Sequence, residues 1–225
     1  MARGAAALGP LNATRMNDAI EWYHGTDTRF TDWQFPPPLP PQRKGLRAHT
    51  AVFLTSDLTL GSGAGRHLCS AQLHPTARVL DLCQLSSESD ALRQAVGRAE
   101  LGSHCLWTHS VVDWCVGWNS GETMRFAPDR SAFSARLASL MPPAELAKAG
   151  SRAPKHQAAW LELQNLTRDW IELIAVTGRD LGYDALLANE VDRHRPGPPI
   201  ACPLLIALNA KALTSPNWIF GSRGR

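Results

Sequence analysis

The chain has 225 residues, of which 44% are hydrophobic and 19% charged, so it can bury a core and is not disordered as a whole. A chain of this length is expected to fold as a single domain over residues 1–225. Its 23 basic and 20 acidic residues leave a net charge of +3, which is too balanced for a dedicated nucleic-acid clamp.

The cysteines and the hydropathy of the chain indicate in which cellular compartment the protein works. The five cysteines are odd in number and none belongs to a CxxC pair, which argues against a disulfide framework or structural zinc site and favours a reducing compartment. No stretch of about 18 apolar residues is present, and the first residues do not form a convincing signal peptide. We therefore expect a protein without a membrane partner that works in a cytosol, either its own or that of a host.

The N-terminal third of the chain predicts short strands. Residues 19–27 form an apolar run that ends in a glycine and an aspartate, which is typical of a strand followed by a turn. Residues 49–57 are rich in Val, Phe, Leu and Thr and predict a buried strand. Two further short strands are expected at 71–74 and 78–82.

Proline and glycine dominate the segments between these strands. The proline run at 35–45 predicts an extended, solvent-facing polyproline II segment. The glycine-rich run at 61–65 predicts a flexible loop. It also resembles a phosphate-binding loop with Arg66 as counter-charge, but it lacks the Lys-Ser/Thr of a P-loop and the glycine spacing of a dinucleotide fold. We therefore expect residues 61–65 and Arg66 to bind a phosphate group only as one part of a larger ligand pocket.

The middle of the chain changes to helical periodicity. Ser86 and the acidic residues after it form a helix-capping signature. Residues 129–140 and 156–182 repeat apolar residues at helical spacing. The cluster of His and Cys at 104–115 supplies only two or three ligands on one segment, so we interpret it as core cysteines and surface histidines and expect no metal.

Strand character returns near the end of the chain. Residues 183–191 and 202–209 predict strands, and residues 209–213 predict a final turn. The order of strands, helices and strands, without regular alternation, predicts an α+β fold. We expect a mostly antiparallel or mixed sheet with a helical insertion at about residues 86–180.

The most informative motif is the tetrapeptide Tyr23–Thr26. A histidine at a strand end, followed by glycine, leaves room for a ligand to approach the backbone. This motif is followed by similar pieces at Phe53–Asp57, Gly182–Leu187 and Leu204–Leu213. Together they resemble the ADP-ribosyltransferase superfamily, in its diphtheria-toxin and poly(ADP-ribose) polymerase branch, which includes bacterial toxins and effectors.

The resemblance implies a split mixed or antiparallel β-sheet core and the transfer of ADP-ribose from NAD with loss of nicotinamide. His24 would donate to the adenosine-side ribose, and the Gly25 backbone would hold the nicotinamide amide. Thr55 or Ser56 would form the floor of the pocket. The residues implied to bind NAD are Tyr23, His24, Gly25, Thr26, Phe53, Thr55, Ser56, Arg66 and His67.

The chain departs from the family pattern at two positions. The tyrosine that usually stacks on nicotinamide is missing between residues 53 and 82, so His67 or Phe53 would supply the flat ring. The position of the usual catalytic glutamate falls near Leu204, which cannot accept a hydrogen bond. Glu190 is the nearest acidic alternative, so the catalytic residues are expected to be His24 and Glu190.

Several chemical groups could accept the ADP-ribose. Arginine-modifying relatives carry an E-x-E pair, which this chain lacks, so a hydroxyl, an acidic side chain or a nucleobase is expected. The weak charge asymmetry favours a protein acceptor over nucleic acid. By resemblance, that protein could belong to a host, with ubiquitin as one example. The alternatives are a non-catalytic module of the same fold that binds a protein partner, and a transferase that acts on nucleic acid.

Overall fold

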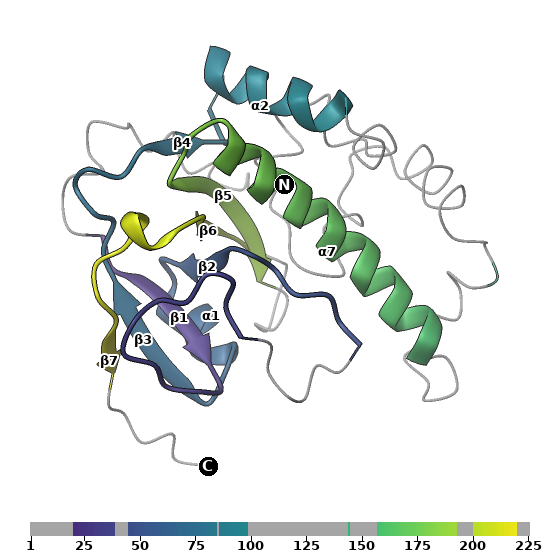
Figure 1. Ribbon diagram of the computed structural model, residues 1–225. Helices are drawn as coiled ribbons and strands as arrows, with labels where there is room; N and C mark the ends of the chain where they lie inside the picture. The colour runs from purple at the N-terminus through teal and green to yellow at the C-terminus, as the bar shows by residue number, and fades with distance from the viewer. Residues whose placement is uncertain are drawn as a thin grey trace, which may run out of the picture.

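The computed structural model describes residues 20–38, 45–84, 86–98, 144, 157–192 and 200–219 (Figure 1). The strands are β1 Trp22–Thr26, β2 Val52–Thr55, β3 His67–Ala71, β4 Val79–Asp81, β5 Ala185–Asp192, β6 Ile200–Ala207 and β7 Asn217–Ile219. The helices are α1 Leu58–Gly63, α2 Ser87–Arg98, α7 Gln157–Asp180 and the short 3₁₀ turn η6 Ala210–Ala212. This content confirms the predicted α+β class.

The strands of the described part form one seven-stranded mixed sheet in the order β4-β5-β6-β2-β1-β3-β7. The β4–β5 pair is parallel, and the other neighbours are antiparallel. The β5–β6 pair is the most extensive, because its register runs from Ala185↔Ala207 to Asp192↔Ile200.

The sheet opens between β1 and β2. Their register contains the single pair Tyr23↔Thr55, whereas β1 pairs with β3 from Trp22↔Ala71 to Thr26↔His67. On its other side, β2 is fully paired with β6 from Val52↔Ala207 to Thr55↔Leu204. The two halves of the sheet therefore separate beyond Tyr23, and side chains occupy the space where backbone pairing would have continued.

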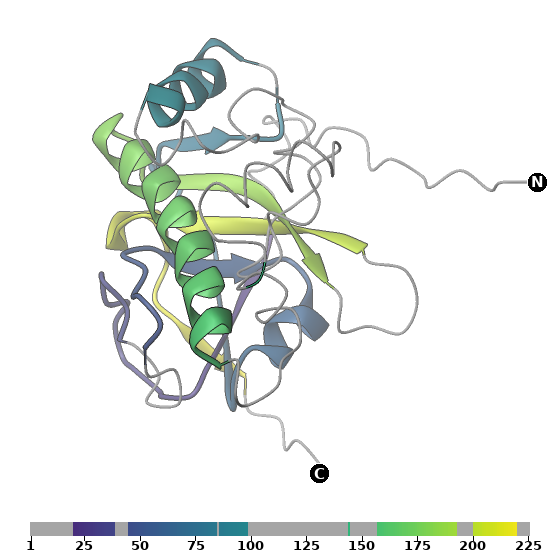
Figure 2. The same ribbon diagram turned by 90° about the vertical axis from the view of Figure 1, so that its right-hand side faces the viewer.

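Each face of the sheet is covered by its own apolar cluster. Strand β6 shows why, since successive side chains point to opposite faces. Leu204 and Ile206 belong to a cluster with the buried residues of α2 and α7, whereas Leu205 and Ala207 belong to a second cluster on the opposite face. Figures 1 and 2 show α7 running diagonally across the first face, with α2 beside it.

Helix α7 lies close against β5 because of a glycine. A Cβ atom on Gly178 would lie 2.9 Å from a methyl group of the buried Leu186, so a side chain here would force Leu186 to shift. The helix ends at Asp180, and Gly182 just beyond it adopts a φ of 82° and donates its N–H to the Arg179 carbonyl at 2.9 Å. A left-handed glycine of this kind is a common helix terminator.

Several sequence predictions are confirmed, and others need correction. The strands expected at 19–27, 49–57, 78–82, 183–191 and 202–209 correspond to β1, β2, β4, β5 and β6. The strand expected at 71–74 is wrong in its bounds, because β3 covers His67–Ala71 and Leu73 forms only an isolated bridge. Strand β7 was not predicted.

The flexible loop predicted at 61–65 is wrong, because its first three residues complete helix α1. The Asp57 side chain accepts hydrogen bonds from Thr59 N–H at 2.8 Å and Leu60 N–H at 3.0 Å, which starts the helix despite two glycines within it. Helices form at α2 and α7, within the segment predicted to be helical. Residues 129–140 and the His and Cys cluster at 104–115 lie outside the described residues.

Candidate functional site

A cavity of about 300 Å³ lies where β1 and β2 separate. Its wall is formed by β1 and the loop after it, by β2 and α1, by the α7 residues Arg168 and Ile171, and by β5 and β6. This volume is within the range of small-molecule sites. His24 and Glu190, which are far apart in the sequence, both line this one cavity.

His24 bridges the opening in the sheet. Its Nδ1 lies 2.8 Å from the Phe53 carbonyl oxygen, which can only accept a hydrogen bond, so Nδ1 carries the proton. Burial lowers the pKa of His24 below its ordinary value, although the bond to Phe53 opposes this shift. The ring is therefore neutral near pH 7, and its Nε2 is an acceptor. The expectation that His24 donates to a ribose hydroxyl needs correction, since the hydroxyl would donate to His24.

Gly25 is required by the packing of α1. A Cβ atom at this position would lie 2.2 Å from the Gly61 carbonyl oxygen and 2.9 Å from the Ala64 Cβ. At Gly65, a Cβ would lie 2.4 Å from the backbone of Thr26. These glycines thus bring α1 against β1, and the space that the Gly25 side chain leaves is filled by the protein itself.

The glycine-rich segment begins within helix α1. Two N–H groups at the start of α1 are already bonded to the Asp57 carboxylate. Arg66 lies outside the cavity wall, where its exposed guanidinium Nε is 3.6 Å from the Asp27 carboxylate. Gly61 and Ala64 of this segment do line the cavity, and Arg66 does not, so the expected pairing with a pyrophosphate stays a prediction.

The remaining residues named from the sequence divide into two groups. Tyr23, Thr26, Phe53 and Thr55 line the cavity, and Thr55 is buried. Ser56 and His67 are not among the lining residues. The His67 ring instead packs perpendicular to Trp218 at a centroid distance of 6.3 Å.

Two of the flat rings that line the cavity come from the loop after β1. Phe30 and Trp33 line the cavity, and the Trp33 ring lies edge-on to His24 at a centroid distance of 5.7 Å. The Trp33 indole N–H donates to the Thr214 carbonyl at 2.8 Å, which fixes this loop against the C-terminal part of the chain. Of the two ring candidates from the sequence, Phe53 lines the cavity and His67 does not.

The proline run also contributes to the wall. Pro37 and Pro38 line the cavity, and Phe35 packs against the apolar cluster that includes Trp22. The prediction that the run faces solvent is therefore wrong at Phe35 and Pro37, which are half-buried, and holds at Pro36 and Pro38, which are exposed. Residues 39–44 lie outside the described residues.

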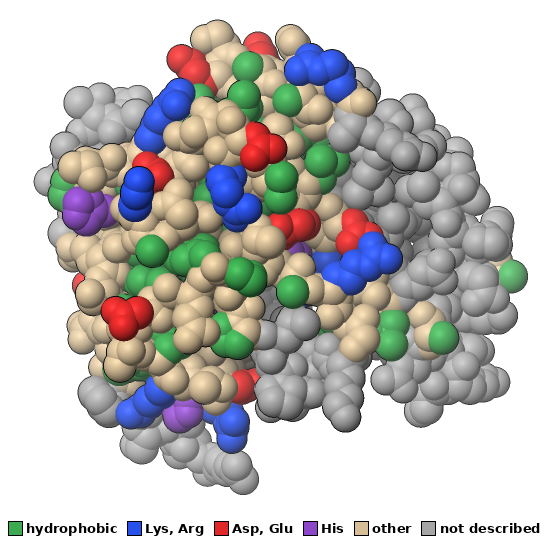
Figure 3. All heavy atoms as spheres, viewed as in Figure 1, with side chains coloured by type: hydrophobic (Ala, Val, Ile, Leu, Met, Phe, Trp, Pro, Cys, Tyr) green, Lys and Arg blue, Asp and Glu red, His purple; other side chains and the backbone are tan. Residues whose placement is uncertain are grey.

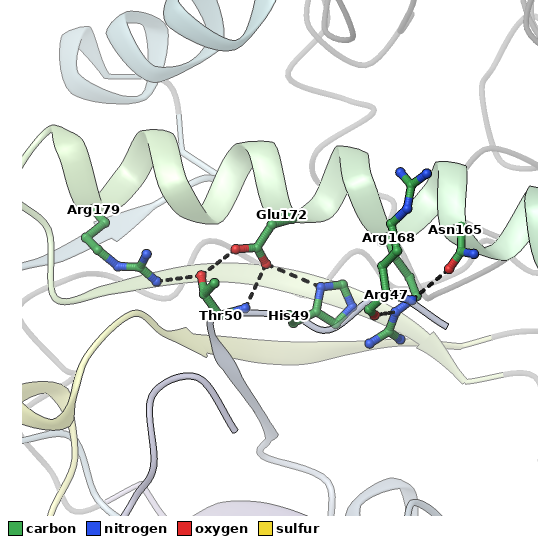
Figure 4. Close-up of polar contacts among 7 residues, drawn as sticks. All are labelled: Arg47, His49, Thr50, Asn165, Arg168, Glu172 and Arg179. Carbon is green, nitrogen blue, oxygen red and sulfur yellow. Dashed lines mark hydrogen bonds and ion pairs between the residues drawn. The ribbon is translucent and has the colours of Figure 1, made fainter. Parts of the chain in front are cut away.

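A seam of polar contacts joins α7 to the segment before β2 (Figure 4). Glu172 accepts hydrogen bonds from Thr50 N–H at 2.9 Å and from the Thr50 hydroxyl, and it lies 3.5 Å from His49 Nδ1. Burial raises the pKa of Glu172, but the approach of His49 and the hydrogen bonds from Thr50 outweigh it and leave the pKa below its ordinary value. Arg179 donates to Thr50 Oγ1 at 2.8 Å, so Thr50 is held from two positions on the helix.

His49 and Arg168 extend this polar seam into the cavity. His49 is buried, lines the cavity, and packs its ring edge-on against Phe53 at a centroid distance of 4.9 Å. Arg168 is 5% exposed, lines the same cavity and donates its Nε–H to the Arg47 carbonyl. Sequence reasoning missed both residues, because neither belongs to a motif.

Within the described ranges, no group of three or more His, Cys, Asp or Glu is placed to hold a metal ion. Among the helices of these ranges, none combines the length and the apolar character needed to cross a membrane. Figure 3 shows basic and acidic side chains interspersed over the described part of one face.

No protein-family model matches the sequence, and no curated protein matches it either. One solved chain is similar in structure, the crystal structure of an anti-CRISPR protein. It shares 12% sequence identity, and the match covers 88% of this chain and 94% of that chain at a TM-score of 0.37. A similarity at this level carries no argument about fold or function.

Proposed function

We propose that the protein is an ADP-ribosyltransferase that moves ADP-ribose from NAD to a protein acceptor and releases nicotinamide. The observation that supports this proposal is the presence of His24 and Glu190 in the wall of one cavity, at the opening between β1 and β2. The resemblance of the YHGT segment to the transferase family gives this pair its interpretation.

In this reaction, the bond between the ribose C1′ and the nicotinamide nitrogen breaks, and positive charge develops on the sugar. Catalysis requires groups that hold the sugar and stabilise that charge in the transition state. The neutral His24 would accept a hydrogen bond from one ribose hydroxyl. The Glu190 carboxylate would accept from the hydroxyl beside C1′ and stabilise the cationic carbon. The acceptor then forms a bond to C1′ and loses its proton to solvent.

The nicotinamide ring would lie against the aromatic part of the wall. Phe30 and Trp33 pack together at a centroid distance of 5.0 Å and both line the cavity. Either ring would replace the tyrosine that the family usually supplies. A protein acceptor is favoured because the 23 basic and 20 acidic residues of the chain nearly balance.

A second candidate function is a module that binds the dinucleotide without transferring it. Leu204 lines the cavity at the place where the resemblance puts the catalytic glutamate. A leucine there supplies neither charge nor a hydrogen bond. The two candidates differ in whether Glu190, on the neighbouring strand β5, takes over the catalytic role.

Incubation with radiolabelled NAD tests the proposal. Wild-type protein should release nicotinamide and label a protein in a cell lysate, and Glu190→Gln should reduce the rate by about 100-fold or more while NAD affinity changes little. Glu21→Gln is the matched control, since Glu21 is exposed and does not line the cavity.

Other results of this experiment would favour a different function. A wild-type protein that binds NAD without turnover would support the binding module. Label on a purified oligonucleotide, with none on lysate proteins, would replace the protein acceptor by a nucleic acid. A Glu190→Gln rate equal to wild type would exclude Glu190 as the catalytic acid.

A further inference from the structure

The aromatic wall of the cavity is carried by a loop. Phe30 and Trp33 follow strand β1 and line the cavity, and residues 27–38 form neither helix nor strand. A loop of this kind samples several conformations unless tertiary contacts hold it. The ligand would then have to order the rings on it, and that cost weakens binding. The bonds that fix this loop therefore affect how tightly a planar ring binds.

Two indole N–H groups connect this loop with the C-terminal segment, one in each direction. The Trp33 N–H of the loop donates to the Thr214 carbonyl at 2.8 Å. The Trp218 N–H of strand β7 donates to the Phe30 carbonyl at 3.1 Å. An indole nitrogen can only donate, so each bond also fixes the orientation of its ring. The loop is thus tied to the C-terminal segment both at Phe30 and at Trp33.

The C-terminal segment is itself anchored on the sheet. The Thr214 N–H donates to the Gln72 carbonyl at 2.9 Å, and the Gln72 N–H donates to the Thr214 hydroxyl oxygen at 2.9 Å. Strand β7 then pairs with β3, with Trp218 opposite the buried Cys69. The two tryptophans therefore connect the loop to backbone that the sheet already holds.

Trp218 also supports the Phe30 ring from outside the cavity. The two rings pack edge-on at a centroid distance of 5.2 Å. The Arg29 guanidinium carbon lies 5.7 Å from the centroid of the same indole, and the His67 ring packs against it at 6.3 Å. Trp218 is not among the residues that line the cavity. It would therefore act on a ligand through Phe30 and not by contact.

We propose that Trp218 is a positioning residue for the planar ring of the ligand. It holds Phe30 at the cavity wall, so that the ring meets a preformed aromatic surface. This inference rests on the proposed function for the identity of that ring as nicotinamide. It assigns the recognition of nicotinamide to the loop after β1 and to the C-terminal strand that anchors this loop.

Titrations with two ligands that differ in the nicotinamide ring test the inference. Carbocyclic NAD keeps the ring on a bond that is not cleaved, and ADP-ribose lacks the ring. Trp218→Phe keeps an aromatic side chain but loses the indole N–H. In calorimetry it should bind carbocyclic NAD about 3- to 10-fold more weakly than wild type does. Its affinity for ADP-ribose should stay within about twofold, because that ligand has no ring to place on the aromatic wall.

Ile219→Ala is the matched control, because Ile219 is the next residue of β7, is 38% exposed and does not line the cavity. It should leave both affinities unchanged. The inference is overturned if Trp218→Phe weakens both ligands equally or neither, or if Ile219→Ala causes the same loss. If Trp218→Phe does not fold, as judged by urea denaturation, Trp218→Tyr takes its place with the same expected loss, since tyrosine also lacks the indole N–H.

Turnover of NAD, measured in parallel, separates this inference from the proposed function. Trp218→Phe should raise KM for NAD and leave kcat within about twofold, because Trp218 lies outside the cavity. A selective loss of carbocyclic NAD binding, in a protein that never cleaves NAD, would refute the transferase and leave the role of Trp218 intact. Turnover with an unchanged KM would refute the role of Trp218 alone. A wild-type protein that binds neither ligand would refute both.

Discussion

The two sides of the cavity are built in different ways. On the side of β1 and α1, backbone packs directly on backbone, with Gly25 against the Gly61 carbonyl and Gly65 against Thr26. On the side of α7, long polar side chains such as Glu172 join the helix to the segment before β2. At Gly25 and Gly65 the first side leaves no room for a Cβ atom, whereas the second side depends on hydrogen bonds and charge. His24 therefore lies next to closely packed backbone, and Arg168 lies next to a network of polar side chains.

The largest effect on stability is expected for Gly25→Ala. The new Cβ would lie 2.2 Å from a backbone oxygen of α1, so either the helix or the strand must shift. We expect a loss of about 3 kcal/mol in the free energy of unfolding, measured by urea denaturation. Gly63→Ala is the control, because nothing lies within 4 Å of its Cβ, and it should stabilise the helix by about 0.5 kcal/mol.

Equal stabilities for these two alanine variants would show that α1 does not pack as tightly on β1 as the contacts indicate. The side of β1 and α1 would then not differ from the side of α7 in how closely its backbone packs.

A smaller loss is expected on the polar side, for Glu172→Ala. This change leaves the Thr50 N–H and hydroxyl and the His49 ring without their acceptor. The expected loss is about 2 kcal/mol in the free energy of unfolding. Asn165→Ala removes two bonds to more exposed backbone groups and should cost about 0.5 to 1 kcal/mol. If Asn165→Ala were the more destabilising variant, Glu172 would not be the residue of this seam that contributes most to stability.

The smallest effect is a dependence of stability on pH through Glu172. Its pKa is lowered in the folded protein, so its contribution is fully present above the pKa of an unfolded glutamate, about 4.3, and is lost as the pH falls through the folded value. The stability difference between wild type and Glu172→Gln should therefore shrink between about pH 6 and pH 3, as measured by urea denaturation. A difference that stays constant over this range would contradict the account.

The strands could be predicted from the sequence because their apolar residues are local signals. Residues 52–55 and 204–207 are continuous apolar or β-branched runs, and β2 and β6 form there. Helix α1 was missed because its glycines favour a loop, and the Asp57 cap that starts it is a single residue. Strand β7 has three residues and adds to an edge already formed by β3, so it gives too short a signal.

The cavity could be predicted only where a motif marked it. His24, Gly25 and Thr55 belong to segments with a recognisable pattern, and they line the cavity. Trp33 and Arg168 arrive there through tertiary contacts, by the indole bond to Thr214 and by the path of α7 across the sheet. No local feature of the sequence encodes either position.

The central claim is that one cavity holds the reacting part of NAD between His24 and Glu190. A crystal structure of the Glu190→Gln protein with NAD measures this directly. The account predicts the nicotinamide riboside half at the opening between β1 and β2, with a ribose hydroxyl within hydrogen-bond distance of His24 Nε2. NAD bound at another surface, or a cavity that stays empty at saturating NAD, would contradict it.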